Sequence, residues 1–216
     1  MASVLITSGL LMLSDAGLTL AWQEPISAYL AQLQQDKLGN ELDSSGTRSL
    51  VRQEQAAVAS IRDAKKRIAK LAAVERKRAK KGHPIGRIDL PTLHRHYVVV
   101  QGTDDTTLRK GPGHYPGTSF PGQGKTTAIA GHRTTYLAPF RTINQLKPGD
   151  PIVMKMPYAT LTYRVEKTQV VKPDALWITR PVKGEERLVL SACHPLYSAS
   201  HRIIAFARLV SETETG

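Results

Sequence analysis

The sequence predicts a mainly β protein in which residues 83–216 form a closed barrel of short, mostly antiparallel strands. Seven short runs rich in β-branched and aromatic residues follow Pro84. Turn sequences such as GPGHYPG and KPGDP separate them, and only one brief helical stretch, APFRTINQL, interrupts them. Short strands punctuated by turn signals, with no long helix between them, indicate a barrel rather than a doubly wound parallel sheet. Residues 1–22 and 23–82 precede this domain as two further segments.

The first of these segments is predicted to anchor the chain in a membrane. Residues 2–22 are apolar except for Asp15 and are long enough to span a bilayer, and Trp22 stands where an interfacial aromatic residue is typical. A buried helix and a signal peptide are the alternatives. The basic start and small-residue cleavage site of a signal peptide are missing, while Asp15 in mid-membrane would be costly. Few positive charges follow the segment, so we expect a single-pass protein of the cell membrane with its C-terminal domain outside.

The second segment concentrates the charge of the chain. The formal net charge is +12, and residues 62–81 contain ten basic and two acidic residues, which gives +8 in that stretch. Residues 47–81 are predicted to form one long helix ending near Gly82 and Pro84. Its apolar residues recur at spacings of three and four: Leu50, Ala57, Ile61, Ala64, Ile68 and Leu71.

Two interpretations of this basic helix are open. It is a solvated spacer, or it is a surface that adheres to an anionic wall polymer or lipid. Binding of nucleic acid is not favoured, because no aromatic residues are interleaved with the basic ones and no known reader motif is present.

The stretch SFPGQGKTT at residues 119–127 looks superficially like a phosphate-binding loop. The motif needs a glycine five positions before Gly124, where the chain has Ser119, and Pro121 has no N–H to donate. The sequence that follows, TTAIAGH, has the pattern of a strand rather than a helix. We therefore do not expect a nucleotide site here.

Three predicted strand ends carry reactive side chains. His132 ends one strand, Cys193 ends another, and Arg202 begins the last. A cysteine nucleophile needs a nearby cation, and an arginine fork can hold an oxyanion. Each residue alone is weak evidence. A lone cysteine after an apolar strand is more often a core residue, and six other histidines, among them His194 and His201 beside the candidate site, compete with His132.

No cofactor or metal is predicted. The pair of histidines in HRH, residues 94–96, lacks a third ligand. The stretch TDDTTLRKGPG offers only Asp104 and Asp105 beside two basic residues, which is fewer oxygen ligands than calcium sites use.

A family resemblance chooses among these possibilities. The sequences AIAGHRTTYLAPF, LKPGD and LVLSACHPLYSASHRIIAFARL resemble the sortase family over roughly residues 84–210. The stretches GHYPGTSFPG, GHRTTYLAPF and CHPLYSASHR are most similar to class E sortases of high-GC Gram-positive bacteria. The resemblance implies an eight-stranded sortase-type barrel, with His132, Cys193 and Arg202 as the catalytic residues. Residues 119–127 then correspond to the loop that leads into the strand of the catalytic histidine.

The resemblance also implies an activity and partners. A sortase is a cysteine transpeptidase that cleaves a secreted protein at a C-terminal sorting signal, here Leu-Ala-x-Thr-Gly or Leu-Pro-x-Thr-Gly, and joins it to an amine of a peptidoglycan precursor. Candidate substrate-binding residues are Tyr115, Ala192 and His194. Ala192 departs from the family, which usually has a threonine before the cysteine, so the side-chain hydrogen bond of that threonine is lost. A hydrolytic cysteine endopeptidase and a non-catalytic barrel that binds anionic wall polymers are the competing hypotheses.

Overall fold

The computed structural model describes residues 6–9 and 25–215 of the chain. Within these residues, no helix combines the length and the apolar character that crossing a membrane requires. Apart from residues 6–9, the membrane span expected at residues 2–22 lies outside the described part of the chain.

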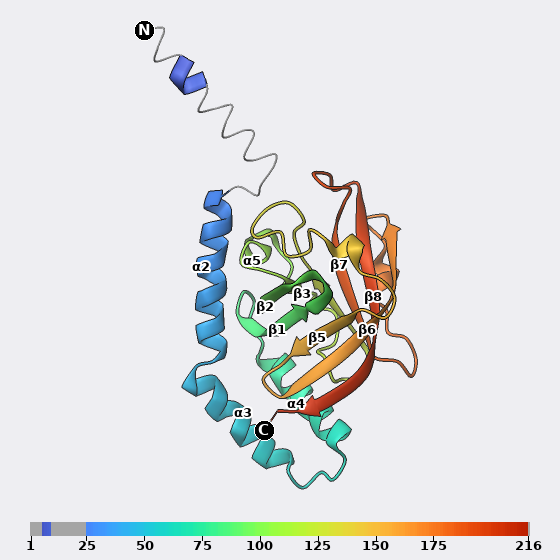
Figure 1. Ribbon diagram of the computed structural model, residues 1–216. Coiled ribbons are helices and arrows are strands. Elements are labelled where there is room, and N and C mark those ends of the chain that lie inside the picture. Colours follow the sequence, from blue (N-terminus) through green and yellow to red (C-terminus); the bar gives the residue numbers. More distant parts are fainter. Residues whose placement is uncertain (1–5, 10–24, 216) are drawn as a thin grey trace.

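Eight strands form a closed barrel in the order β1-β2-β3-β4-β7-β8-β6-β5, which confirms the predicted barrel (Figure 1). All seven strands expected from the sequence are present, and β3 is an additional strand of two residues inside the predicted turn GPGHYPG. The strands are β1 (Pro84–Leu90), β2 (Arg95–Gln101), β3 (Gly113–His114), β4 (Thr126–Ala130), β5 (Pro151–Lys155), β6 (Ala159–Val171), β7 (Arg187–His194) and β8 (His201–Glu214).

Six of the neighbouring pairs are antiparallel, and two, β2–β3 and β4–β7, are parallel. In the β4–β7 pair the register runs from Thr126 opposite Arg187 to Ala130 opposite Ser191. Parallel neighbours end at the same edge of a sheet, so the residues that follow β4 and β7 emerge side by side.

The two faces of β7 bury different clusters, as the alternation of side chains along a strand requires. Leu188, Leu190 and Ala192 point into the barrel and belong to the main core. Val189 lies on the outer face in a second apolar cluster. The other buried members of this cluster are Ala128, Val171, Ile178, Ile204 and Phe206.

The segment before the barrel forms three helices, α2 (Pro25–Leu42), α3 (Ser45–Val58) and α4 (Ala64–Arg78). The expected single helix over 47–81 is therefore wrong. The helix is interrupted between Val58 and Ala64. The Asp63 side chain caps α4 by accepting hydrogen bonds from two backbone N–H groups.

The interpretation of this region as a solvated spacer is also wrong for α4. Ile68 and Leu71 are each 1% exposed and, with the fully buried Ala72, belong to the main core of the barrel. The narrow apolar stripe of the sequence is thus the face by which α4 packs on the barrel.

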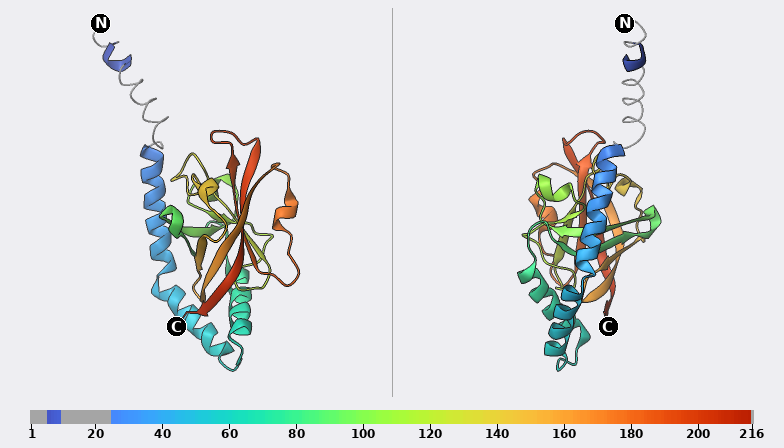
Figure 2. Two further views of the ribbon diagram at one scale, coloured as in Figure 1. Left: turned by 45° about the vertical axis from the view of Figure 1, so that its right-hand side comes forward. Right: turned by 90° about the vertical axis from the view of Figure 1, so that its left-hand side faces the viewer.

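The helices cover one side and one end of the barrel (Figure 2). In all three views α2 runs alongside the strands. Its first residues lie at the end where the β7–β8 hairpin projects, whereas α3 and α4 lie at the other end, near the C-terminus. Gln35 fixes α2 to β2, because its side chain accepts from Val98 N and donates to the carbonyls of Val98 and Lys110.

The remaining helical pieces are short. They are α5 (Asp105–Leu108) and the 3₁₀ turns η1 (Pro91–Leu93), η2 (Ile143–Gln145) and η3 (Leu176–Thr179). The helix expected at APFRTINQL is reduced to η2.

Candidate active site

The structure places His132, Cys193 and Arg202 at one end of the barrel. Cys193 and Arg202 are direct partners across the antiparallel β7–β8 pair. Beyond the last β4–β7 pair, the N–H of Gly131 donates to the carbonyl of Ser191 at 3.0 Å. His132 and Cys193 each lie two residues beyond the paired Ala130 and Ser191, so both follow the same end of these neighbouring strands.

His132 is half-buried, and its Nε2 atom is buried without a hydrogen-bond partner among the described residues. Its ring lies 5.3 Å from the ring of Tyr136, centroid to centroid. Burial lowers the pKa of His132; Asp105 acts in the opposite direction and Arg109 adds to the lowering. The neutral imidazole is therefore favoured in this structure.

The loop after β4 is tightly held. A Cβ atom on Gly131 would lie 2.5 Å from the ring of Phe140, so only glycine fits directly before His132. Phe140 N in turn donates to the carbonyl of His132 at 3.0 Å. Tyr136, Leu137 and Ala138 all have positive φ, a conformation that is strained for residues with side chains.

Arg202 rests on the β7–β8 loop. Its Nη1 atom donates to the carbonyls of Ala199 and His201, each at 2.9 Å. Within the described residues, its Nε and Nη2 atoms donate to no protein acceptor, so part of the guanidinium fork remains available to a ligand oxygen beside Cys193.

A cavity of about 360 Å³ opens beside Cys193. It is lined by Arg133, Thr134, Cys193, Pro195, Tyr197, Ser198 and Ala199. Arg133, which reasoning from the sequence missed, is only 5% exposed. Its position directly after the candidate histidine was the only signal, and its burial is not visible in the sequence.

The three candidate substrate-binding residues have different surroundings. Tyr115 packs against the outer apolar cluster on the face of the sheet that carries Val189. Ala192 is 3% exposed in the barrel interior, so a side-chain contact with a substrate is not available to it. His194 is half-buried, and its Nδ1 atom lies 3.2 Å from Nη1 of Arg133.

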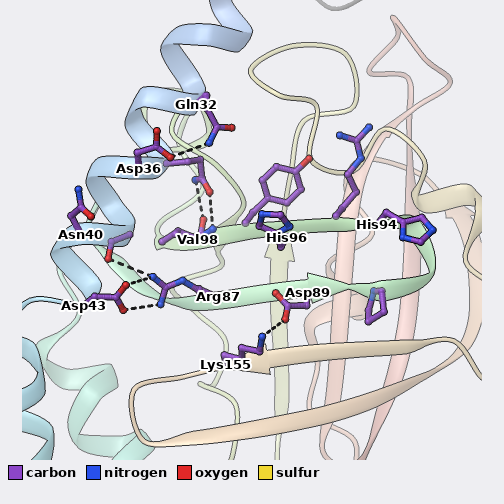
Figure 3. A pocket seen from close by; sticks show the side chains of 15 residues that line it. Gln32, Asp36, Asn40, Asp43, Arg87, Asp89, His94, His96, Val98 and Lys155 are labelled. Carbon is purple, nitrogen blue, oxygen red and sulfur yellow. Dashed lines mark hydrogen bonds and ion pairs between the residues drawn. The ribbon is translucent and has the colours of Figure 1, made fainter.

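A larger cavity, about 940 Å³, lies elsewhere, between α2 and the outer face of β1 and β2 (Figure 3). Two ion pairs lie in it, Arg87 with Asp43 at 2.7 Å and Lys155 with Asp89 at 2.5 Å. His94 and His96 line it, but the described residues contain no group of three or more possible metal ligands. This polar crevice is where α2 docks on the barrel, and it holds none of the candidate catalytic residues.

The glycine-rich loop does bind an anion, but the anion belongs to the chain itself. The carboxylate of the buried Glu186 accepts from Gly122 N and Gly124 N, both at 2.6 Å. Gly122 and Gly124 have positive φ, which lets both N–H groups turn toward this carboxylate. The strand predicted after the loop is β4, in agreement with the argument against a nucleotide site.

Asp104 and Asp105 are likewise engaged in protein contacts. Asp104 caps α5, accepting from Thr107 N and from the hydroxyls of Thr106 and Thr107, and these bonds hold its pKa well below the usual range. Asp105 pairs with Arg109 at 2.6 Å.

A closed barrel that places a thiol, an imidazole and a guanidinium at one edge has the parts of a cysteine acyl-transfer enzyme. The comparison with known families agrees with this class. The family model described as the Sortase domain matches residues 88–210, more than half of the chain. The chain belongs to the sortase family.

Two relatives are themselves named as sortases. The chain is 30% identical to Sortase D of Bacillus subtilis over 133 residues, 60% of this chain and 66% of that protein. It is 35% identical to Sortase SrtE1 of Streptomyces coelicolor over 92 residues, 39% of this chain and 26% of that protein. The crystal structure of Sortase E1 from S. coelicolor with a tripeptide in the active site is similar, with a TM-score of 0.59 and 25% identity. That match covers 63% of this chain and 93% of that one.

Proposed function

We propose that this chain is a membrane-anchored, class E-like cysteine transpeptidase that acts outside the cell. It cleaves a C-terminal sorting signal, Leu-Ala-x-Thr-Gly or Leu-Pro-x-Thr-Gly, between Thr and Gly. It then transfers the acyl group to an amine of a peptidoglycan precursor. The observation that carries the proposal is that Cys193 lies directly opposite Arg202 and at the end of β7 that neighbours the end of β4, which His132 follows.

In the first half-reaction the thiolate of Cys193 attacks the threonine carbonyl carbon, and Arg202 donates to the oxyanion that forms. Collapse of this intermediate breaks the C–N bond as imidazolium His132 gives its proton to the departing glycine nitrogen. The products are a thioester on Cys193 and neutral His132.

In the second half-reaction an amine attacks the thioester, His132 accepts the amine proton, and the Cys193 thiolate leaves. Burial favours neutral His132, so only the fraction of molecules holding both thiolate and imidazolium is ready for the first step. The tripeptide bound in the active site of the S. coelicolor relative supports a peptide as the donor substrate.

The N-terminal segment supplies the anchor in this proposal, because residues 2–22 have the length and apolar character of a membrane span. The exposed basic residues of 62–81 provide a second, electrostatic attachment to an anionic surface. No cofactor, metal or nucleic acid takes part.

The test is incubation of the protein with a labelled Leu-Ala-x-Thr-Gly peptide and an added amine, followed by mass spectrometry. We expect a product in which the amine replaces the residues after threonine, with no change on adding a chelator. A free-acid product whose amount does not change with added amine would identify a hydrolytic endopeptidase. No cleavage at all would favour the non-catalytic barrel that binds anionic wall polymers.

Two variants assign the residues. Cys193→Ala changes one half-buried side chain and should abolish cleavage while leaving Tm nearly unchanged. Arg202→Lys keeps the charge but loses the planar fork, and we expect a loss of about 10²–10³ in kcat. Cleavage at the wild-type rate by folded Cys193→Ala would refute the mechanism, and a loss under about threefold for Arg202→Lys would remove it from the oxyanion role.

A further inference from the structure

We propose that Arg133 is a positioning residue that locks the strand end bearing Cys193 onto the loop bearing His132 and places a fixed positive charge beside the thiol. This rests on the proposed role of Cys193 as nucleophile. Four acceptors surround this one side chain. Two belong to the end of β7 and two to the segment between β4 and β5.

The hydrogen bonds of Arg133 connect two separate parts of the site. Nη1 donates to the carbonyl of Cys193 and to Nδ1 of His194, both at 3.2 Å. On the other side, Nη2 donates to the carbonyl of Arg141 at 3.1 Å and to Oδ1 of Asn144 at 2.9 Å, and Nε donates to the same Arg141 carbonyl at 3.3 Å. One planar group thus fixes β7 relative to the β4–β5 loop.

Arg133 also determines the tautomer of His194. An arginine side chain can only donate, so Nδ1 of His194 must accept, and the proton of its neutral ring lies on Nε2. His194 is thereby fixed as part of the wall behind Cys193 and is not free to turn toward a substrate.

The charge of Arg133 has no carboxylate partner among the described residues. All four acceptors are neutral, although the side chain is 5% exposed and buried cations are normally paired with an anion. The titratable and charged groups that face it are Arg141 on its own loop, and Cys193 and His194 on β7. Of these, only the thiol of Cys193 can become an anion.

The electrostatics agree with this geometry. Burial lowers the pKa of Arg133, Arg141 lowers it further, and Cys193 acts in the opposite direction.

The test compares Arg133→Gln, which removes the charge, with Arg133→Lys, which keeps the charge but cannot reach all four acceptors. Arg67→Lys is the matched control, because Arg67 also bridges elements through its guanidinium, at the far end of the barrel. Since Cys193 is the only cysteine, its alkylation by iodoacetamide can be followed from pH 5.5 to 9 without interference. Tm, kcat and KM are measured on the same samples.

For Arg133→Gln we expect slower alkylation of Cys193, because the variant removes the positive charge beside the thiol. Arg133→Lys should keep most of the alkylation curve but lose about tenfold or more in kcat with little change in KM, as expected for lost positioning. Arg67→Lys should lower Tm and leave both the curve and kcat unchanged.

An unchanged alkylation curve in folded Arg133→Gln would overturn the electrostatic part. If that variant does not fold, an unchanged kcat in Arg133→Lys overturns the positioning part, and a curve displaced equally in Arg67→Lys overturns both. Alkylation needs no peptide substrate, so it still decides the role of Arg133 if the proposed transpeptidase activity is absent.

Discussion

At the scale of single residues, Asp105 of α5 and Arg109, which follows α5, act on the protonation of His132 in addition to burial. Asp105 raises the pKa of His132 and Arg109 lowers it, against the larger lowering due to burial. Arg109 also lies 5.5 Å from the ring centroid of Tyr136, which packs on His132. Asp105 and Arg109 therefore adjust the fraction of imidazolium with opposite signs.

We predict that Asp105→Asn lowers the pKa of His132 and that Arg109→Gln raises it. Both side chains are exposed, so each displacement should be a few tenths of a pH unit and should shrink in high salt. Titration of the His132 ring by NMR measures these displacements. The control is Asp174→Asn, at an exposed position on the β6–β7 loop. Displacements of the same sign in the two variants would contradict this account.

Some residues of the candidate site could be predicted from the sequence and others could not. The local β pattern placed His132, Cys193 and Arg202 at strand ends, but only the resemblance to sortases selected them from the other candidates as catalytic residues. Their adjacency depends on the parallel pairing of β4 with β7, which no local pattern encodes. Arg133 was missed because its importance lies in being buried, and an arginine in a loop sequence is ordinarily exposed.

At the scale of elements, α4 acts as part of the barrel rather than as a stalk. Its regular spacing of apolar residues was visible in the sequence, but whether such a stripe faces solvent or a partner depends on tertiary packing. The interruption of the helix before Asp63 was missed for a related reason. The Arg and Lys residues around Asp63 favour helix, and its role as an N-cap is visible only in the folded structure.

We therefore predict that a form of the protein starting at Gly82 is destabilised. Removing Ile68 and Leu71 uncovers the end of the barrel and forfeits about 3–6 kcal/mol of apolar burial. Thermal unfolding of this form and of one starting at Pro25 gives the comparison, and only the first should lose stability.

The corresponding point variants separate packing from length. Leu71→Ala should cost about 2–5 kcal/mol, whereas Lys70→Ala at the exposed neighbouring position should cost little. A form starting at Gly82 that unfolds at the wild-type temperature would show that α4 contributes nothing to the barrel.

The contact between α3 and α4 is predicted to depend on pH. Burial, and then Glu54 of α3, raise the pKa of Glu75 to about 7, with Arg78 opposing. Because this pKa lies above the ordinary value of 4.5, the protonated carboxyl stabilises the fold. The contribution is complete below pH 4.5 and is lost as pH rises through about 7.

Glu75→Gln should remove this dependence by holding a neutral group at every pH. Solvent screening reduces the effect of a half-buried side chain, so we expect Glu75→Gln to be more stable than the wild type at pH 8 by about 1–2 kcal/mol. The two should be nearly equal at pH 5. Tm measured across this range, with Asp174→Asn as the control, tests it, and equal slopes for wild type and Glu75→Gln would contradict the assignment.

At the scale of the whole molecule, the candidate site and the basic helix lie at opposite ends of the barrel. The first residues of α2 lie near the β7–β8 hairpin, while α4 lies at the far end (Figure 2). An 18-residue helix is about 27 Å long, more than three Debye lengths at physiological salt. If residues 2–22 anchor the chain, α2 therefore separates α4 from the lipid surface.

This arrangement favours the anionic wall over the lipid as the partner of α4. Nine of the ten basic residues between Arg62 and Lys81 are exposed: Arg62, Lys65, Lys66, Lys70, Arg76, Lys77, Arg78, Lys80 and Lys81. They surround the buried face of α4, so the packing that joins α4 to the barrel leaves its charged face outward. Attraction of this kind needs no particular sequence in the polymer and weakens as salt is added.

We predict that replacing Lys65, Lys66, Lys70 and Lys77 together by Gln weakens binding of the full-length protein to wall fragments, more at 50 mM salt than at 300 mM. The control replaces four exposed lysines of the barrel, Lys125, Lys147, Lys172 and Lys183, by Gln, which changes the net charge equally. Peptide cleavage should be unchanged in both, since α4 is remote from Cys193. Sedimentation with wall fragments and with anionic vesicles measures the two partners separately. Equal losses in both sets of variants would mean that net charge alone drives binding, and loss of vesicle binding alone would assign α4 to the membrane instead.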